Sequence, residues 1–355
     1  MPHSRMRWMI VLVLMAILAA SCGSAAAPAG APTVAAPATA TLAAAATSAP
    51  TATNVPPTVT VATAAPVATT PAPTPAASAI TLTDSLSRTV TLAAPARRVV
   101  SLAPSNTEIL YAIGAGAVLA GRDDYSDYPA AATAVPSIGN EIPLNIEAIV
   151  ALHPDLVLAA GITSADDVAQ LAKLGLTVYA TSNAGSLDDI YHDIHAIGVL
   201  VGQVEAADQL AASMQARVDA VKTKMAAVTQ HAIVFYEIDA TDPSKPWTAG
   251  PGSFIDQLIT LAGGNNAGSG LGDKYAQISL EQLVTRNPDI IVLGSSTLGG
   301  QTPALVAARP GWGTIKAVKN HAVYAFDDNL VSRPGPRVVD GLEKLAALIH
   351  PDLFK

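Results

Sequence analysis

The chain has 355 residues, more than one ordinary domain holds, because single hydrophobic cores usually stop growing near about 250 residues. Its formal net charge of −8 argues against nucleic acid as a partner. The one cysteine, Cys22, excludes an intramolecular disulfide framework.

Residues 1–22 have the pattern of an export signal. Arg5 and Arg7 precede an apolar run from Trp8 to Ala20, which is shorter than the roughly 20 residues of a membrane span. Cys22 follows three small residues, as in a bacterial lipoprotein signal. We therefore expect cleavage before Cys22 and lipidation of its thiol. An ordinary secretory signal with an incidental cysteine is the alternative.

Residues 23–79 consist almost entirely of Ala, Pro, Thr, Val and Ser. A segment without charge or aromatic side chains cannot bury enough surface to offset the entropy lost on ordering. We predict a disordered tether between a membrane anchor and a globular head. Glycosylation of its Ser and Thr residues is compatible with this composition.

The head, residues 80–355, alternates apolar strand patterns with amphipathic helix patterns. Predicted strands cover 97–102, 117–121, 156–160, 176–181, 231–238, 290–293 and 322–326, and predicted helices cover 105–114, 145–152, 164–175, 253–264 and 279–286. Such alternation indicates α/β architecture with mainly parallel sheets. We expect two Rossmann-like lobes, 80–185 and 230–355. Ser105 and Glu108 have the spacing of a capping box at the first helix.

One unit occurs twice, as NIEAIVALHPDLVL from Asn145 and as SLEQLVTRNPDIIVL from Ser279. Each copy has a capping residue, a short apolar helix, a proline that ends it, and a continuous apolar run typical of a buried parallel strand. Glu147 and Glu281 hold matching positions. The repeat predicts two similar lobes.

Between the lobes, residues 186–229 have a helical pattern. An apolar stripe recurs at steps of three or four from Val204 to Val228. At ~1.5 Å per residue this predicts a rigid rod of about 40 Å.

The head resembles the helical-backbone class of periplasmic binding proteins, the receptors of ABC importers for cobalamin, ferric siderophores or heme. The resemblance is carried by RRVVSLAPSNTEILYAIGAG, DDYSDYP, the two repeats, WTAGPGSFIDQLITLAGGNN, VKNHAVYAFDD and SRPGPRVVDGLEKLA. These phrases span the head in the order typical of the family, and they are most similar to the cobalamin receptors. The loop GNEIPLN departs from that branch, which often has an aromatic residue there.

The resemblance implies that Glu147 and Glu281 dock onto the permease. A glutamate in a first helical turn is also favoured by the helix dipole alone. The ligand would lie in a cleft between the lobes, and the resemblance together with placement in loops indicates these contacts: Tyr125, Tyr128, Trp247, Tyr275, Asp327, Asp328 and Arg333. For each aromatic residue, packing against its own lobe is the alternative.

Other classes of site receive less support from the residues. His192 and His195 have helical metal-ligand spacing but lack a third ligand, so we expect no metal site. AGPGS at 249–253 lacks the Gly-Lys-Ser/Thr of a P-loop. A secreted hydrolase is the rival class, although no G-x-S-x-G motif is present.

We therefore predict a non-catalytic, extracytoplasmic solute-binding lipoprotein that needs no cofactor. It would be a monomer, would bind a corrinoid or alternatively a ferric siderophore or heme, and would deliver this ligand to a permease with its ATPase subunits.

Overall fold

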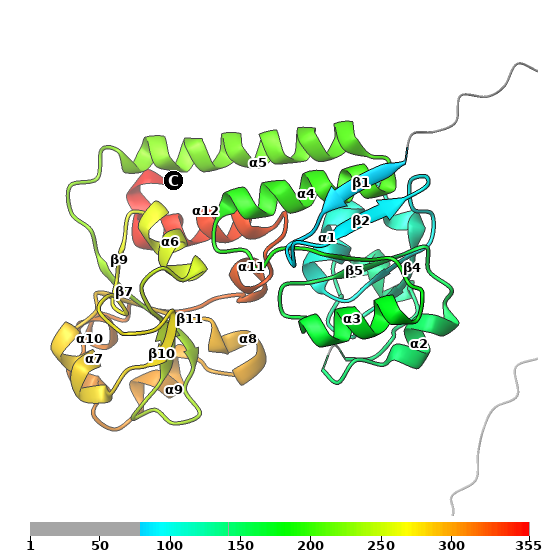
Figure 1. The fold of residues 1–355 in the computed structure, drawn as a ribbon. Helices are drawn as coiled ribbons and strands as arrows, with labels where there is room; N and C mark the ends of the chain where they lie inside the picture. Colours follow the sequence, from blue (N-terminus) through cyan, green and yellow to red (C-terminus); the bar gives the residue numbers. More distant parts are fainter. Residues whose placement is uncertain (1–78, 141, 355) are drawn as a thin grey trace, which may run out of the picture. The chain divides into compact units, whose positions relative to one another are not determined.

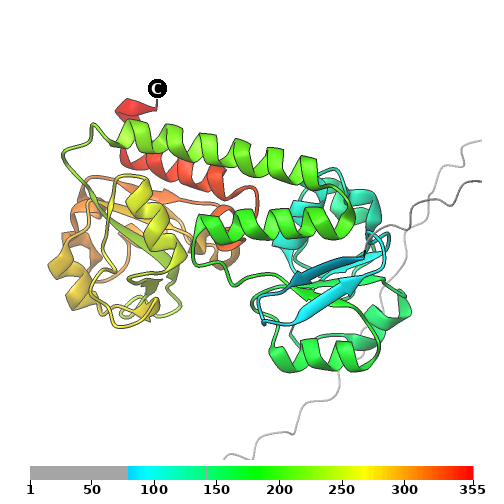
Figure 2. The same ribbon diagram turned by 45° about the horizontal axis from the view of Figure 1, so that its top comes forward.

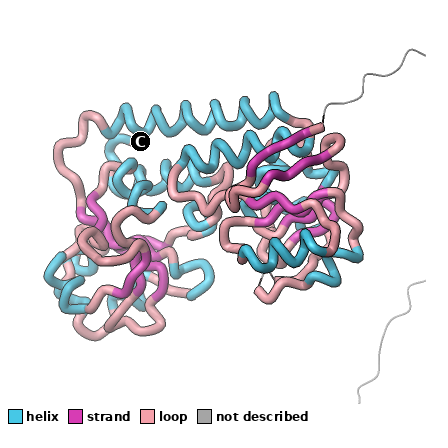
Figure 3. Tube along the Cα trace, viewed as in Figure 1, coloured by secondary structure: helices cyan, strands magenta, loops and turns pink. Residues whose placement is uncertain are grey.

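The computed structural model describes residues 79–140 and 142–354, which all belong to one compact unit, Ala72–Lys355. The predicted signal with Cys22, and the predicted tether except Ala79, lie outside the described residues. No described helix is both long and apolar enough to cross a membrane. Figures 1 and 3 show helices and strands alternating along the unit.

The N-terminal lobe contains a parallel sheet in the order β4-β3-β5-β6. A separate antiparallel hairpin, β1 (Ile80–Thr83) and β2 (Thr89–Leu92), precedes it. The remaining elements of this lobe are β3 (Val99–Ser101), α1 (Pro104–Ala112), η1 (Gly116–Val118), β4 (Leu119–Arg122), η2 (Ala130–Ala134), α2 (Ile146–Ala151), β5 (Leu156–Ala159), α3 (Ala165–Lys173) and β6 (Val178–Ala180).

The C-terminal lobe contains a mixed sheet in the order β10-β8-β7-β11-β12, with β9 also paired to β7. Strands β7, β11 and β12 run parallel, whereas β8 pairs antiparallel with both β7 and β10. The elements are β7 (Ile233–Asp239), β8 (Trp247–Ala249), α6 (Phe254–Leu261), β9 (Asn265–Asn266), β10 (Tyr275–Gln277), α7 (Leu280–Arg286), β11 (Ile290–Leu293), α8 (Ser295–Gly299), α9 (Pro303–Ala307), η3 (Trp312–Thr314), α10 (Lys316–Lys319), β12 (Val323–Ala325), α11 (Asn329–Ser332), α12 (Val338–Ile349) and η4 (Pro351–Leu353).

The predicted connecting region forms two helices that pack against each other, α4 (Leu187–Val201) and α5 (Val204–Met225), and α5 covers most of the predicted rod. The break occurs at Gly202, which ends α4 in the left-handed region with φ 72°, a conformation that glycine adopts without steric cost. Figure 2 shows α4 lying beside α5, and α5 leading to the C-terminal lobe. The apolar stripe of α5 is confirmed, because it buries Ala207, Met214, Val218 and Val221.

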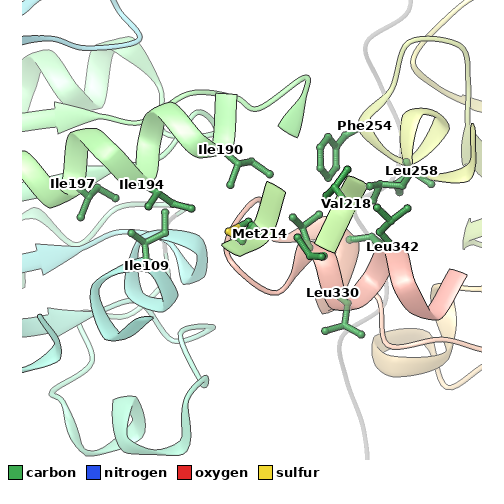
Figure 4. Packing of buried hydrophobic residues seen from close by; sticks show 14 of the residues in the cluster. Ile109, Ile190, Ile194, Ile197, Met214, Val218, Phe254, Leu258, Leu330 and Leu342 are labelled. Carbon is green, nitrogen blue, oxygen red and sulfur yellow. The ribbon is translucent and has the colours of Figure 1, made fainter. Parts of the chain in front are cut away.

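One apolar core passes through both lobes and the connecting helices. It includes Ile109 of α1, Ile194 of α4, Met214 of α5, Leu258 of α6 and Leu342 of α12, and Figure 4 shows these side chains along one buried layer. Outside this layer, Arg217 of α5 binds Asp340 and Glu343 of α12, at 2.6 Å from each. The connection between the lobes is therefore a packed layer rather than a bare helix.

Each sheet is also covered on its other face. Ile149 of α2 and Val168 of α3 pack with Val157 in the N-terminal lobe, and Leu283 of α7 and Trp312 pack with Ile291 in the C-terminal lobe. Strands β5 and β11 are buried at every residue. This burial explains their continuous apolar sequences.

The predicted capping box at the first helix is wrong. Helix α1 begins at Pro104, and its N-cap residue Ala103 makes no side-chain cap. Ser105 lies inside the first turn, and Glu108 binds Arg337, 229 residues further along the chain. The expected end of this helix is confirmed, since Gly114 has φ 75°.

Candidate functional site

A cavity of about 340 Å³ is lined by both lobes. The N-terminal lobe contributes the segments that follow β3, β5 and β6, namely 103–105, 160–162 and 182–184. These segments lie at the carboxyl ends of parallel strands, where α/β sheets usually bind ligands. The C-terminal lobe contributes the end of β7, strands β8 and β10, the start of α6, and residues 328–334.

A second cavity, of about 550 Å³, adjoins the first. The two share Pro104, Ile162, Ser332 and Arg333. We call their combined space the cleft. Its size is in the range of small-molecule sites, which are usually concave and predominantly apolar.

Trp247 and Tyr275 form an aromatic wall of the smaller cavity. Both were expected in loops, but they belong to two short paired strands, β8 and the edge strand β10: Trp247 pairs with Gln277, and Tyr275 pairs with Ala249. Because side chains alternate along a strand, these four residues share one face of the strand pair. Trp247 and Tyr275 are 41% and 48% exposed as whole residues, so a ligand has access to them.

Tyr125 lines the larger cavity from the N-terminal lobe and is 57% exposed. Its loop is held by the buried carboxylate of Asp123, which accepts hydrogen bonds from the Tyr125 amide at 2.9 Å and from the Ser126 hydroxyl. Burial raises the pKa of Asp123, although these hydrogen bonds act in the opposite direction. Both lobes thus contribute an exposed aromatic ring to the cleft.

Two predicted contacts lie apart from the others. Tyr128 lines a different cavity, of about 360 Å³, and the Arg337 guanidinium stacks 4.0 Å above its ring. Asp327 is exposed and accepts a hydrogen bond from the Asn329 amide, and it lines neither cavity of the cleft. The structure therefore does not bring Tyr128 or Asp327 together with Tyr125, Trp247 and Tyr275.

Asp328 lines the smaller cavity, where the Tyr236 hydroxyl donates to its Oδ1 at 2.7 Å. Burial raises the pKa of Tyr236 well above its usual value, and the charge of Asp328 adds to this effect. The pKa of Tyr275 is also raised, first by burial and then by Asp328. Both phenols are consequently kept protonated and able to donate hydrogen bonds.

Arg333 lines both cavities. Its Nη1 lies 2.6 Å from Oδ1 of Asp127 and 3.5 Å from Oε1 of Glu108. Glu108 is 3% exposed, and Arg337 binds both of its oxygens, at 2.9 and 2.6 Å. Two guanidinium groups from the C-terminal segment therefore bind two carboxylates of the N-terminal lobe across the cleft wall.

Several residues of the cleft were not predicted from the sequence. Ile142, Ile162 and Leu298 line the larger cavity with 76%, 62% and 85% of their surfaces exposed. Isolated apolar residues in otherwise polar or glycine-rich loops are the only signal that would have indicated them. Exposed aliphatic side chains gathered at a cavity are typical of a binding site.

The loop after β6 also contributes polar groups to the cleft. Asp193 of α4 accepts from the Ser182 hydroxyl at 2.6 Å and from its amide, which fixes this loop; burial raises the pKa of Asp193. A side chain at Gly161 would lie 2.3 Å from the Cα of Asn183. The close approach of these two loops thus requires glycine.

The two matching glutamates lie outside the cleft. Glu147 and Glu281 are exposed in the first turns of α2 and α7. Among the described residues, neither is part of an ion pair. Both carboxylates are thus accessible to an external partner.

Across the described ranges, no cluster of three or more His, Cys, Asp or Glu side chains could hold a metal ion. His195 Nδ1 lies 2.7 Å from Asp208 on α5, which gives it a structural contact. At AGPGS, the Gly252 amide donates to Asp256 at 2.9 Å, and Ser253 caps α6. This turn therefore binds a carboxylate of its own chain.

The family model for periplasmic binding protein matches residues 99–330. The chain belongs to this family. An uncharacterized ABC transporter substrate-binding lipoprotein of Bacillus subtilis is 36% identical to this binding protein over 281 residues, which are 78% of the chain and 87% of the relative. The vitamin B12-binding protein of Vibrio cholerae is 31% identical over 258 residues, covering 72% and 90%.

The crystal structure of a periplasmic heme-binding protein from Roseiflexus sp. RS-1, in apo form, is similar to this binding protein with a TM-score of 0.66 and 26% identity. The match covers 72% of this chain and 99% of that one. This binding protein is therefore a substrate-binding component of an ABC transport system. It is not an enzyme, because the family consists of solute-binding transport components. The hydrolase hypothesis is rejected on this ground.

Proposed function

We propose that this protein captures a corrinoid in the cleft and delivers it to an ABC permease. The observation that carries the proposal is the pairing of exposed aromatic rings from opposite lobes, Trp247 and Tyr275 on one side and Tyr125 on the other. Flat apolar side chains offer stacking surface to a large, flat ring system. Two relatives in the family are named for binding vitamin B12 or cobalamin, at 31% and 30% identity.

The polar lining of the cleft is compatible with the peripheral amides of a corrinoid. Ser182 and Asn183 offer neutral hydrogen-bonding groups, and the Tyr275 phenol is kept protonated. Amides require both donors and acceptors, and Asp328 supplies an acceptor at the same wall. Arg333 is bound to Asp127, so its charge is already compensated.

A ferric siderophore or heme is the second candidate. It is favoured by the similarity to the Roseiflexus heme-binding protein and by the two tyrosines of the cleft, since a tyrosine can bind heme iron. The raised pKa of Tyr275 disfavours this role for that residue, because iron binds the phenolate. Tyr125 is then the remaining tyrosine of the cleft that could act as a ligand to iron.

Calorimetric titration of the purified protein with cyanocobalamin, heme and a ferric hydroxamate tests the proposal. We expect binding of cyanocobalamin, accompanied by quenching of tryptophan fluorescence. Trp247→Phe should remove most of this quenching, whereas the fully buried Trp312 continues to report on folding. Failure of the wild-type protein to bind cyanocobalamin would reject the corrinoid, and tight binding of heme or the hydroxamate would then support the second candidate.

The remaining proposals concern placement of the protein at the membrane. Lipidation of Cys22 would anchor the chain, residues 23–79 would form a tether, and the lobes 80–185 and 230–355, joined by 186–229, would bind the ligand. The similarity to a Bacillus subtilis lipoprotein supports the anchor. Cys22→Ala should release the protein from the membrane fraction, and retention of this variant there would contradict the anchor.

A further inference from the structure

We propose that Asp127 determines ligand specificity by compensating the charge of Arg333, so that the cleft disfavours anionic ligands. The inference rests on the proposed function, because it concerns the charge of the ligand that the same cleft admits. It identifies the favoured ligand as one without net negative charge near Arg333.

Arg333 occupies the point where an anionic ligand would be recognised. It lines both cavities and, within the described residues, is the one Lys or Arg that lines either of them. Its side chain is only 11% exposed, so its interactions are less screened than those of a surface arginine. A guanidinium in such a place would ordinarily bind a carboxylate or catecholate of the ligand.

The Arg333 guanidinium is already paired with a carboxylate of the protein itself. Nη1 of Arg333 donates to Oδ1 of Asp127 at 2.6 Å, whereas Oε1 of Glu108 is 3.5 Å away. Glu108 has Arg337 as its closer partner, through two hydrogen bonds. Glu108 and Asp127 carry two negative charges and Arg333 and Arg337 carry two positive charges, so the cluster as a whole is neutral.

Further carboxylates face the same space. Besides Asp127, Asp328 lines the smaller cavity and Asp123 lines the larger one. The turn at the start of α6, beside the cavity residue Phe254, also binds a carboxylate of this chain, since Asp256 accepts from the Gly252 amide. An anionic ligand would therefore meet additional negative charge after displacing Asp127 from Arg333.

Asp127 is the member of the cluster that a ligand can reach. Its side chain is 60% exposed, whereas that of Glu108 is 2% exposed. Burial tends to raise the pKa of Asp127, but the hydrogen bond and charge of Arg333 outweigh burial and hold it below its usual value. Asp127 is consequently ionised at neutral pH and repels a ligand of like charge.

A matched pair of ligands isolates this effect. Cyanocobalamin can be compared with its monocarboxylates, in which one peripheral amide is hydrolysed to a carboxylate, and heme with its two propionates gives an independent anionic probe. Wild-type protein, Asp127→Asn and Asp124→Asn are titrated with each by calorimetry. Asp124 lies in the same loop, accepts from the Ser137 hydroxyl and lines neither cavity, so its variant makes the same change in charge away from the cleft.

For Asp127→Asn we expect the affinity for at least one monocarboxylate, relative to cyanocobalamin, to rise by about tenfold or more over wild type. Heme affinity should rise in the same direction. Asp124→Asn should change neither quantity. Addition of Arg333→Gln to Asp127→Asn should remove the gain, because the freed guanidinium is its cause. Circular dichroism melting checks that each variant is folded.

Equal ligand preferences in Asp127→Asn and Asp124→Asn would overturn the inference, as would a gain that survives Arg333→Gln. These outcomes are distinct from failure of the proposed function, which appears as absent cyanocobalamin binding in the wild-type protein. In that case the titrations of wild type and Asp127→Asn with heme still decide whether Asp127 disfavours anionic ligands.

Discussion

The two copies of the repeated unit share their backbone geometry and differ in what supports it. Asn145 caps α2 through the Ala148 amide, and Ser279 caps α7 through the Gln282 amide. Each helix is followed by a residue with positive φ, 46° at His153 and 47° at Asn287. In the C-terminal copy, Gln282 completes a capping box.

The Pro-Asp of each copy has a common structural role. Asp155 accepts from the amides of Arg97 and Arg98, directly before β3, and Asp289 accepts from the amide of Ile233 at the start of β7. Each aspartate thereby joins its own strand to the central strand beside it. Only Asp289 also binds a lysine, Lys316.

The residues that the two copies share fall into two groups, those that make structural contacts within the fold and those that do not. The capping residues, the turns and the Pro-Asp aspartates all make contacts within the fold. These structural roles explain why the same sequence pattern occurs twice. Glu147 and Glu281 are exposed and outside the ion pairs of the described residues, so the contacts within the fold do not use them. The helix dipole favours a glutamate at both positions, and docking onto the permease is the role that we propose for the pair.

The largest expected effect is on transport. In a strain that depends on this protein for corrinoid uptake, Glu147→Arg with Glu281→Arg should reduce uptake to background while ligand affinity is retained, because both lobes lose the charge that directs docking. Either single variant should give an intermediate loss. Glu205→Arg, at an exposed glutamate in the first turn of α5, is the matched control. Normal uptake by the double variant would reject docking.

The second prediction concerns stability: breaking a buried ion pair should cost more unfolding free energy in the C-terminal lobe than in the N-terminal lobe. Glu237 of β7 is fully buried and binds Arg309 through Nη2 at 2.9 Å. Arg309→Met leaves this buried charge without a cation, although the Ser295 hydroxyl still donates to it at 2.8 Å, and the change should cost about 3–5 kcal/mol of unfolding free energy. In the N-terminal lobe, Asp84 loses its ion pair in Arg88→Met but keeps backbone donors, so the cost should be about 1–2 kcal/mol.

Urea unfolding of both variants measures this difference. Glu237→Leu combined with Arg309→Met should recover part of the loss, because no charge then remains buried without a partner. Equal costs for Arg309→Met and Arg88→Met would show that the two lobes do not differ in this respect.

The Pro-Asp contacts should be nearly equivalent. Asp155→Ala and Asp289→Ala each remove charge-assisted hydrogen bonds to strand amides, with an expected cost of about 1.5–3 kcal/mol. Lys316 is 54% exposed, so its pairing with Asp289 should add little. A difference above about 1 kcal/mol in urea unfolding would break the equivalence of the two copies.

The helix caps should give the smallest effects. Asn145→Ala and Ser279→Ala should each cost about 1 kcal/mol, because one orphan amide loses its acceptor. Loss at Ser279 should be larger by a few tenths of a kcal/mol, because its hydroxyl also donates to Gln282 Oε1 at 3.3 Å, whereas the amide of residue 279 keeps its bond to Gln282. Thermal unfolding followed by circular dichroism measures both. A larger loss at Asn145 would contradict the capping-box argument.

Local patterns determined most of the elements. Apolar periodicity predicted β3, β5, β6, β7, β11 and β12 and the helices α1, α2, α3, α6 and α7, because each pattern depends on neighbours within a few residues. The strands β8 and β10 escaped prediction. Each is three residues long, and a strand of that length depends on its partners rather than on its own sequence.

The candidate site was only partly predictable, because its composition also depends on contacts between segments that are far apart in the sequence. Aromatic residues are rare in this chain, so Tyr125, Trp247 and Tyr275 were conspicuous, but Tyr128 had the same appearance and lies beside Arg337 in another cavity. The exposure of Ile142 and Leu298 at the cleft depends on how loops of the two lobes are placed.

From sequence alone, the α/β alternation, the duplicated unit and its exposed glutamates were determined, since caps, turns and periodicity act over short distances along the chain. Tertiary structure decided the break of the connecting helices at Gly202 into a packed pair and the mixed sheet of the C-terminal lobe. It also decided the pairing of Arg333 with Asp127, 206 residues apart. Such contacts form only when both lobes pack on a common core, and no local pattern encodes that distance.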